Sequence, residues 1–333
     1  MKDEDTFAGR LDQNQRTVYV LATAPPVPEP LAPRQAFLAA HERLANVAEA
    51  ATGPALVVAA VDSRARVVDA SLVPDRSALV IGRHTECGLR LPHGIVSLRQ
   101  IALLARHDGE RMQVHLWDLN TEQPFSTEDG ETTSALVSDG PVYITTGEYA
   151  LWILPAQLLA ALPPTAREAW EALPPRHFVD RRSPQKAPPG RLWAAPRPTS
   201  NALIEDITHV TVCAPPLLLQ EDEQPEIGWG VLRLASGHQK ARHLVSAERL
   251  ERGILLGRYE RCGLTIGGLD SVSRVHLLVV RIGDEVWAID TASTNGVQRR
   301  GKPISAVVLD AQDELHLARS LSVKWTREIH PEA

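Results

Sequence analysis

The stretch Gly257-Arg258-Tyr259-Glu260-Arg261-Cys262-Gly263-Leu264 repeats Gly82-Arg83-His84-Thr85-Glu86-Cys87-Gly88-Leu89, which stands in the first half of the chain. Both copies share the pattern G-R-x-x-x-C-G-L. Each is followed by a Val-Ser pair and then by two tryptophan-containing β-like runs, in the same order. Internal similarity with ordered downstream landmarks is the signature of a repeated structural unit. The sequence therefore predicts one type of domain that occurs twice.

Short runs of β-forming residues surround both copies of this pattern. In the first half they extend from 55–61 to 149–154, and in the second half from 230–235 to 321–326. Clusters of Asp, Gly, Ser and Pro separate the runs. Many short strands at this spacing are typical of a β-sandwich. The expected fold class is therefore all-β, with two β-sandwiches joined by a proline-rich linker and short helices in the N-terminal arm and the linker.

The expected organisation has five segments, and two of them contain a short helix. The helical spacing of apolar residues predicts these helices at 36–51 and 165–173. Proline-dense and charged stretches between the β-rich regions predict the boundaries. The segments are an acidic and proline-rich arm (1–54), a first sandwich (55–155), a proline-rich linker (156–226), a second sandwich (227–328) and a tail (329–333).

Charge and composition exclude several classes of protein. The chain has 333 residues, with 35 Lys+Arg against 41 Asp+Glu and a net charge of −6. A chain with this net charge has no overall positive electrostatic potential that would attract DNA or an anionic membrane. Any site for an anion must therefore be a local patch. Its three cysteines form no disulfide framework, and the acidic N-terminus has no signal-peptide character. We therefore expect a cytoplasmic protein with no nucleic-acid partner and no membrane insertion.

Three polar clusters in the second copy stand at junctions between the expected strands. They are Gly257-Arg258, Ser273-Arg274-Val275-His276 and Ser293-Thr294-Asn295-Gly296. Loops at one end of a sandwich converge, and binding residues concentrate in such loops. Two guanidinium groups, several hydroxyls and an amide can all donate hydrogen bonds, and the three clusters contain no carboxylate. This set of groups suits a phosphate dianion.

In this order, the three clusters resemble the forkhead-associated (FHA) domain, an eleven-stranded β-sandwich that binds phosphothreonine peptides through its loops. The resemblance covers about residues 228–327. It implies that Arg258, Ser273 and Arg274 bind the phosphate. It further implies that Thr294 lines the pocket for the threonine methyl group and that Asn295 hydrogen-bonds the peptide backbone. The remaining matching positions would be structural, namely Gly257, His276 and Gly296.

Other interpretations of these clusters are weaker. Each cluster alone is typical of a solvated turn, and only their agreement in order and spacing favours a binding site. Ser273 and His276 could be a nucleophile and its base, but no carboxylate is placed to orient the histidine and no strained nucleophile turn is present. The cysteines and histidines lack the spacing of metal ligands. We therefore expect no enzyme activity, no metal and no cofactor.

The first copy departs from the family pattern. It keeps an arginine and a serine at Arg83 and Ser97, and Arg99 places a cation near the phosphate slot. Gln100 replaces the structural histidine, and residues 122–124, which read Glu-Gln-Pro, fall against 294–296. The glutamate would repel a phosphate, although the glutamine beside it could partly replace the lost asparagine. We therefore expect a degenerate first site.

The expected function is that of a phosphothreonine-dependent adaptor in bacterial Ser/Thr kinase signalling, acting through the second sandwich. The expected partners are phosphothreonine-containing proteins, a Ser/Thr kinase and the chain's own tail phosphorylated at Thr6, which follows three acidic residues. Residues 131–134, which read Glu-Thr-Thr-Ser, are a second candidate for phosphorylation. The alternative is a phosphorylation-independent scaffold or assembly subunit of a multiprotein machine, such as a secretion system, that uses both sandwiches as interaction surfaces.

Overall fold

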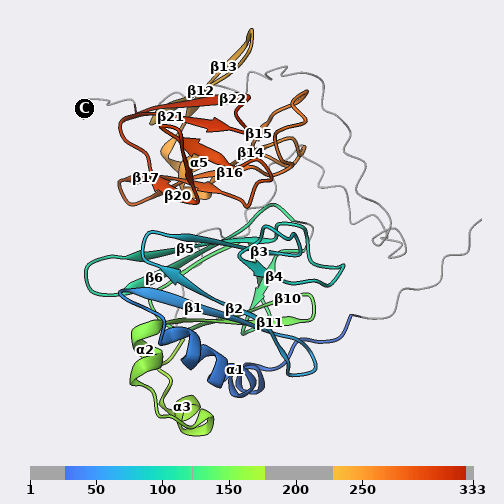
Figure 1. Cartoon of the computed structure of the whole chain (residues 1–333), viewed down its shortest axis with the longest axis vertical. Helices are drawn as coiled ribbons and strands as arrows, with labels where there is room; N and C mark the ends of the chain where they lie inside the picture. The colour runs from blue at the N-terminus through green and yellow to red at the C-terminus, as the bar shows by residue number, and fades with distance from the viewer. Residues whose placement is uncertain (1–26, 122, 177–227, 328–333) are drawn as a thin grey trace, which may run out of the picture. The chain divides into compact units, whose positions relative to one another are not determined.

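Strands β1 to β11 form the first sandwich in the computed structural model, which describes residues 27–121, 123–176 and 228–327 (Figure 1). Their bounds are β1 Ala55–Val61, β2 Val67–Pro74, β3 Ala78–Gly82, β4 Leu89–Arg90, β5 Ile101–His107, β6 Met112–Asp118, β7 Phe125–Thr127, β8 Thr132–Thr133, β9 Ala135–Ser138, β10 Val142–Thr146 and β11 Tyr149–Pro155. One sheet has the order β2-β1-β11-β10-β7-β8, and the other has the order β4-β3-β5-β6-β9.

The second sandwich has the same two sheets in the same strand order. Its orders are β13-β12-β22-β21-β18-β19 and β15-β14-β16-β17-β20, and a short helix, α5 (Ala247–Arg252), precedes β14. This agreement confirms the predicted all-β fold with two sandwiches. The bounds are β12 Gly230–Ser236, β13 Gln239–Val245, β14 Ile254–Gly257, β15 Leu264–Thr265, β16 Leu277–Ile282, β17 Glu285–Asp290, β18 Val297–Arg299, β19 Lys302–Ile304, β20 Ala306–Val308, β21 Gln312–Leu317 and β22 Leu321–Arg327.

Strand β5 illustrates how alternating side chains build two different cores. Ile101 and Leu103 belong to the apolar core between the two sheets of the first sandwich. Ala102 and Leu104, which point to the opposite face of the same strand, belong to a separate buried cluster. All four side chains are fully buried. A strand that is covered on both faces reads as a continuous apolar run, and this is the pattern of residues 101–105.

Three helices cover the outer face of the first sandwich's six-stranded sheet (Figure 1). They are α1 (Pro33–Ala48), α2 (Ala156–Ala161) and α3 (Ala166–Ala172). The indole of Trp152 on β11 is central to this contact, because its ring lies 5.5 Å from Phe37 of α1 and 6.0 Å from Trp170 of α3. The predicted helices at 36–51 and 165–173 are confirmed as α1 and α3, with shifted ends.

Helices α2 and α3, which fall within the expected linker 156–226, pack on the first sandwich. Leu159 of α2 and Ala169 of α3 are buried against the sheet, so both helices are part of the first sandwich's structure. Prolines flank both helices, and for the short helix α2 they obscured the amphipathic pattern. The remainder of the expected linker from residue 177, the arm up to residue 26 with Thr6, and the tail from residue 328 lie outside the described residues. Within the described part of the chain, no helix is long and apolar enough to cross a membrane.

Candidate functional site

Three loops of the second sandwich meet at Ser273, which lies between β15 and β16. The backbone carbonyl of Ser273 accepts a hydrogen bond of 3.1 Å from the backbone amide of Arg258, in the loop after β14. The hydroxyl oxygen of Ser273 accepts a hydrogen bond of 3.0 Å from the backbone amide of Thr294, in the loop after β17. The structure therefore brings together residues from all three of the clusters identified in the sequence.

Gly257 permits the close approach of two of these loops. A Cβ atom at this position would lie 2.1 Å from the backbone oxygen of Arg274. No side chain fits at that distance, so the loops can meet only if this residue is glycine. The first sandwich has the same close approach, since a Cβ atom at Gly82 would lie 2.5 Å from the backbone oxygen of Leu98. The glycine of the repeated Gly-Arg pair is therefore required by the close approach of the loops in both sandwiches.

His276 ties the loops together from inside. Its Nδ1 accepts a hydrogen bond of 2.9 Å from the backbone amide of Ser273, so the ring proton is on Nε2, which lies 3.2 Å from the backbone oxygen of Gly296 and donates to it. The ring is fully buried. Burial lowers the pKa of His276 to about 4, so the imidazole is neutral at pH 7. Gly296 itself has a φ of +72°, a left-handed conformation that favours glycine.

The guanidinium of Arg258 is anchored on one side and ion-paired on the other. Its Nε donates to the backbone oxygen of Val272 at 2.5 Å, and its Nη1 lies 3.3 Å from Oδ1 of Asp270. The Asp270 side chain is 97% exposed, whereas that of Arg258 is 25% exposed. Sequence reasoning missed Asp270, because it lies between the clusters. No motif distinguishes it from an ordinary surface residue.

The other predicted residues surround this arginine. Thr294 and Asn295 are exposed, and Arg274 is half-buried. The amide Nδ2 of Asn295 donates to the backbone oxygen of Ser271 at 2.7 Å, which holds the loop after β17 against the loop after β15. The resulting surface combines two cations, hydroxyls and an amide. Within the described residues, no group of His, Cys, Asp and Glu gathers in a way that could hold a metal ion.

The first sandwich ties the equivalent loops with a glutamine. Oε1 of Gln100 accepts a hydrogen bond of 2.9 Å from the backbone amide of Ser97, and its Nε2 donates to the backbone oxygen of Gln123 at 2.6 Å. These are the two hydrogen bonds that His276 makes in the second sandwich. The arginine is also placed alike, since Nε of Arg83 donates to the backbone oxygen of Val96 at 2.9 Å. The change from histidine to glutamine therefore preserves the loop architecture.

The loop after β6 differs from its counterpart by a deletion. The backbone amide of Thr121 donates to Asp118, as that of Ser293 donates to Asp290, so these positions correspond. The carbonyl of Gln123 then takes the place of the Gly296 carbonyl. One residue, Glu122, which lies outside the described residues, thus stands where the second sandwich has Thr294 and Asn295. Gln123 corresponds to the glycine and not, as predicted, to the asparagine.

The guanidinium of Arg99, which the sequence placed near the first phosphate slot, is directed at the second sandwich. Its Nε and Nη2 both donate to the backbone oxygen of Ala292, at 3.0 and 2.7 Å. The residue is 8% exposed. Because Ala292 belongs to the second sandwich, the charge that the sequence placed at the first phosphate slot makes a contact between the two sandwiches.

Comparison with known proteins places this site in a recognised class of domain. Residues 254–318, which include all three loops, match the family model of the FHA domain. The second sandwich therefore contains an FHA domain. Among curated protein sequences, none matches the chain.

Similar solved structures cover about one sandwich of this chain. The FHA-1 domain of Rv1747 from Mycobacterium tuberculosis shares 18% identity, covers 30% of this chain and 98% of its own, and superimposes with a TM-score of 0.25. The FHA domain of CT664 from Chlamydia trachomatis shares 19% identity and covers 30% and 98%, with a TM-score of 0.27. The assignment of the first sandwich as a degenerate copy rests on its strand order and hydrogen bonds and stays a prediction.

Proposed function

We propose that the second sandwich binds phosphothreonine-containing proteins and that the chain is an adaptor in a bacterial Ser/Thr kinase pathway in the cytoplasm. The observation that supports this function is the convergence of Arg258, Ser273, Thr294 and Asn295 on one surface, held by the neutral ring of His276. The match of residues 254–318 to the FHA domain supports it independently. The role is binding and not chemistry.

Arg258 and Ser273 are arranged to receive the phosphate. With Nε held by a backbone oxygen, the guanidinium of Arg258 keeps its Nη groups for an incoming anion, which would displace the exposed Asp270 carboxylate. The hydroxyl of Ser273 already accepts one hydrogen bond from Thr294, so its own proton remains for donation to a phosphate oxygen. Arg274 would add a second charge-assisted contact.

Asn295 and Thr294 would hold the peptide around the phosphate. The side-chain amide of Asn295 uses one N–H for Ser271, which leaves its carbonyl oxygen and its second N–H for the backbone of a peptide. Thr294 is exposed beside it and would contact the methyl group of the phosphothreonine. This division separates recognition of the charge from recognition of the threonine and its neighbours.

A degenerate phosphothreonine peptide library, incubated with the full chain, tests the proposal. We expect selection of phosphorylated peptides only, and we expect Arg258→Ala to weaken the best peptide by roughly thirtyfold or more, the usual effect of removing a charged hydrogen-bonding partner. Equal binding of the unphosphorylated peptide would contradict the proposal. If Arg258→Ala instead leaves cellular partners bound, the phosphorylation-independent scaffold is the better description.

The chain's own N-terminal tail is one candidate ligand. Thr6 follows Asp3-Glu4-Asp5, an acidic context, but lies outside the described residues. We propose that phosphorylation of Thr6 by a Ser/Thr kinase creates a ligand for the second sandwich. A peptide of residues 1–12 phosphorylated at Thr6 should bind the unphosphorylated full chain, with its unphosphorylated form as control. No binding at high micromolar concentration would eliminate this ligand.

A further inference from the structure

The two sandwiches belong to one compact unit and bury an apolar cluster together. We call this cluster the shared face. It comprises side chains from β3, β5 and β6 of the first sandwich and from β14, β16 and β17 of the second, together with both repeat cysteines. Its main members are Val80, Cys87, Ala102, Leu104, Trp117, Leu255, Cys262, Val275, Leu278, Val280, Trp287 and Ile289.

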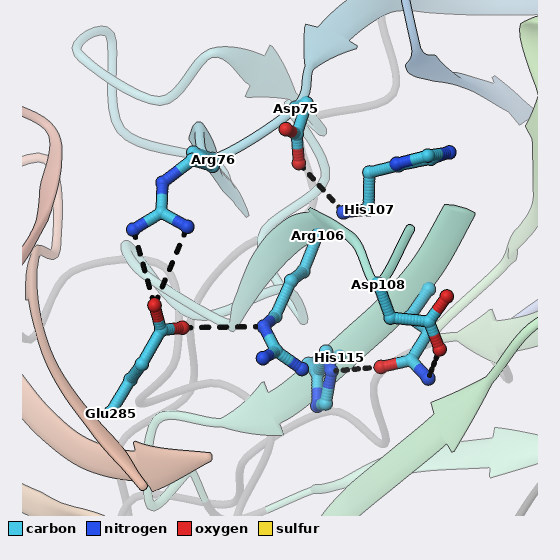
Figure 2. A network of polar contacts seen from close by, with 8 residues as sticks. Asp75, Arg76, Arg106, His107, Asp108, His115 and Glu285 are labelled. Atoms are coloured by element: carbon cyan, nitrogen blue, oxygen red, sulfur yellow. Dashed lines mark hydrogen bonds and ion pairs between the residues drawn. The ribbon is translucent and has the colours of Figure 1, made fainter. Parts of the chain in front are cut away.

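Polar contacts accompany the shared face at both ends of β17. At its first residue, Glu285 forms ion pairs of 3.4 Å with Arg76 and with Arg106, and Figure 2 shows both arginines directed at this carboxylate. Beyond its last residue, Arg99 donates its two hydrogen bonds to Ala292. Asn120 of the first sandwich donates a further hydrogen bond of 2.8 Å to the backbone oxygen of Arg261.

The contact of Arg99 falls on the loop that carries part of the candidate site. Ala292 lies two positions before Thr294 and has a φ of +57°, a left-handed conformation that is unfavourable for alanine. Such a conformation persists only where the surrounding structure holds it. The guanidinium of Arg99 binds the carbonyl of this residue with two donors in a fixed fork, which restricts the orientation of the peptide unit that leads into Ser293 and Thr294.

The fold itself does not require an arginine at this position. Counted from the serines Ser97 and Ser273, the residue equivalent to Arg99 in the second sandwich is Val275, which is 7% exposed and belongs to the shared face. The second sandwich thus places the apolar side chain of Val275 in the shared face. At the equivalent position, the first sandwich places the buried guanidinium of Arg99 against the loop after β17. Burial lowers the pKa of Arg99, and the nearby charge of Arg274 acts in the same direction.

We propose that Arg99 is a positioning residue for the site of the second sandwich. By holding the carbonyl of Ala292, it fixes the loop that presents Thr294 and Asn295, so the first sandwich supports the binding site of the second. The ligand-binding part of this inference rests on the proposed function, whereas the ordering of the loop does not.

Two measurements on the full chain test the inference. The first is amide hydrogen exchange of residues 293–296 without ligand, and the second is the affinity of the phosphothreonine peptide that the library selects. Arg99→Val introduces the residue of the second copy, and Arg99→Lys keeps the charge but loses the fork. Arg106→Val is the matched control, because Arg106 lies on strand β5, where valine is favourable, and pairs with Glu285 at the opposite end of β17.

We expect Arg99→Val to raise exchange of the loop amides and to weaken the peptide by about fivefold or more, while exchange within β16 stays unchanged. Arg106→Val should change neither loop exchange nor affinity. Unchanged loop exchange in Arg99→Val would overturn the inference. Full peptide affinity of Arg99→Lys together with raised loop exchange would also overturn it, because the charge and not the two-donor contact would then support binding. Failure of the wild-type chain to bind any phosphothreonine peptide would refute the proposed function and leave the exchange result as the test of Arg99.

Discussion

Gln100 in the first sandwich makes the same two hydrogen bonds as His276 in the second. Each accepts from the backbone amide of the serine three residues earlier, at 2.9 Å, and each donates to a backbone oxygen in the equivalent loop, after β6 in the first sandwich and after β17 in the second. An amide and a neutral imidazole are therefore interchangeable at this position. They differ in one respect, because only the imidazole can take up a proton.

His276→Gln should remove part of the acid sensitivity of the second sandwich. The pKa of His276 is about 4 in the folded chain against an ordinary 6.5, so the unfolded chain binds more protons between these values. The free energy of unfolding should therefore fall as the pH drops from about 6.5 to about 4, by up to about 3 kcal/mol in the wild-type chain. Urea unfolding at pH 7 and pH 5 measures this difference. An equally steep decline in His276→Gln would contradict the assignment.

Asp270→Asn should strengthen phosphopeptide binding. The Asp270 carboxylate is an exposed ion-pair partner of Arg258, and a phosphate must compete with it. Removing the negative charge should raise affinity by about twofold to fivefold at low salt, the scale of one exposed charge, and less at high salt. Asp284→Asn is the matched control, since the Asp284 side chain is 91% exposed and pairs with Arg281 of β16, outside the three loops of the site. Fluorescence anisotropy with a labelled peptide decides the point, and an equal effect of both variants would refute it.

Gly257→Ala should damage the site, whereas Gly263→Ala should not. At Gly257 a methyl group would collide with the backbone oxygen of Arg274, and at Gly263 it would meet its nearest neighbour at an ordinary 3.6 Å. We expect Gly257→Ala to lose roughly 1–3 kcal/mol of unfolding free energy, the usual cost of overpacking, together with peptide affinity. Thermal unfolding of the two variants provides the comparison. Similar melting temperatures would show that the loops can separate without cost.

The thiols of the shared face should be unreactive in the folded chain. Burial raises the pKa of the Cys87 thiol to about 11 and that of the Cys262 thiol to about 12, so neither is a thiolate at neutral pH. The third cysteine, Cys213, lies outside the described residues and is replaced by serine for the measurement. Iodoacetamide should then modify the chain only in denaturant. Rapid modification of either thiol in native buffer would mean that the shared face opens readily.

Much of the fold could be predicted, because alternation and turn residues are local signals. The strand at 55–61 begins and ends where the sequence placed it, and the strands that begin at 149, 230 and 321 each end one residue later than predicted. The hairpins β7–β8 and β18–β19 were not predicted, because strands of two or three residues are too short to show a period. The helix α2 was missed since prolines flank its few apolar residues. Short elements depend on tertiary packing, which no local pattern records.

Residues of the candidate site could be predicted only where they belong to a short sequence motif within one loop. Its arginine, serine, threonine and asparagine are recognisable in the sequence, but Asp270 and Ala292 have no distinguishing neighbours. The role of Arg99 depends on a contact between residues 193 positions apart. The deletion in the loop after β6 was likewise hidden, since it is visible only once hydrogen bonds identify the corresponding residues.

The contacts of the shared face should hold the two sandwiches together without a covalent connection between them. Each half supplies a largely apolar surface that packs against the surface of the other half. Fragments 27–176 and 228–327, produced as separate polypeptides, should therefore recombine into a noncovalent pair, much as the halves of a split reporter protein do. The association constant of that pair would express the strength of the contact directly, and Arg99→Val would show how much of it a single guanidinium provides.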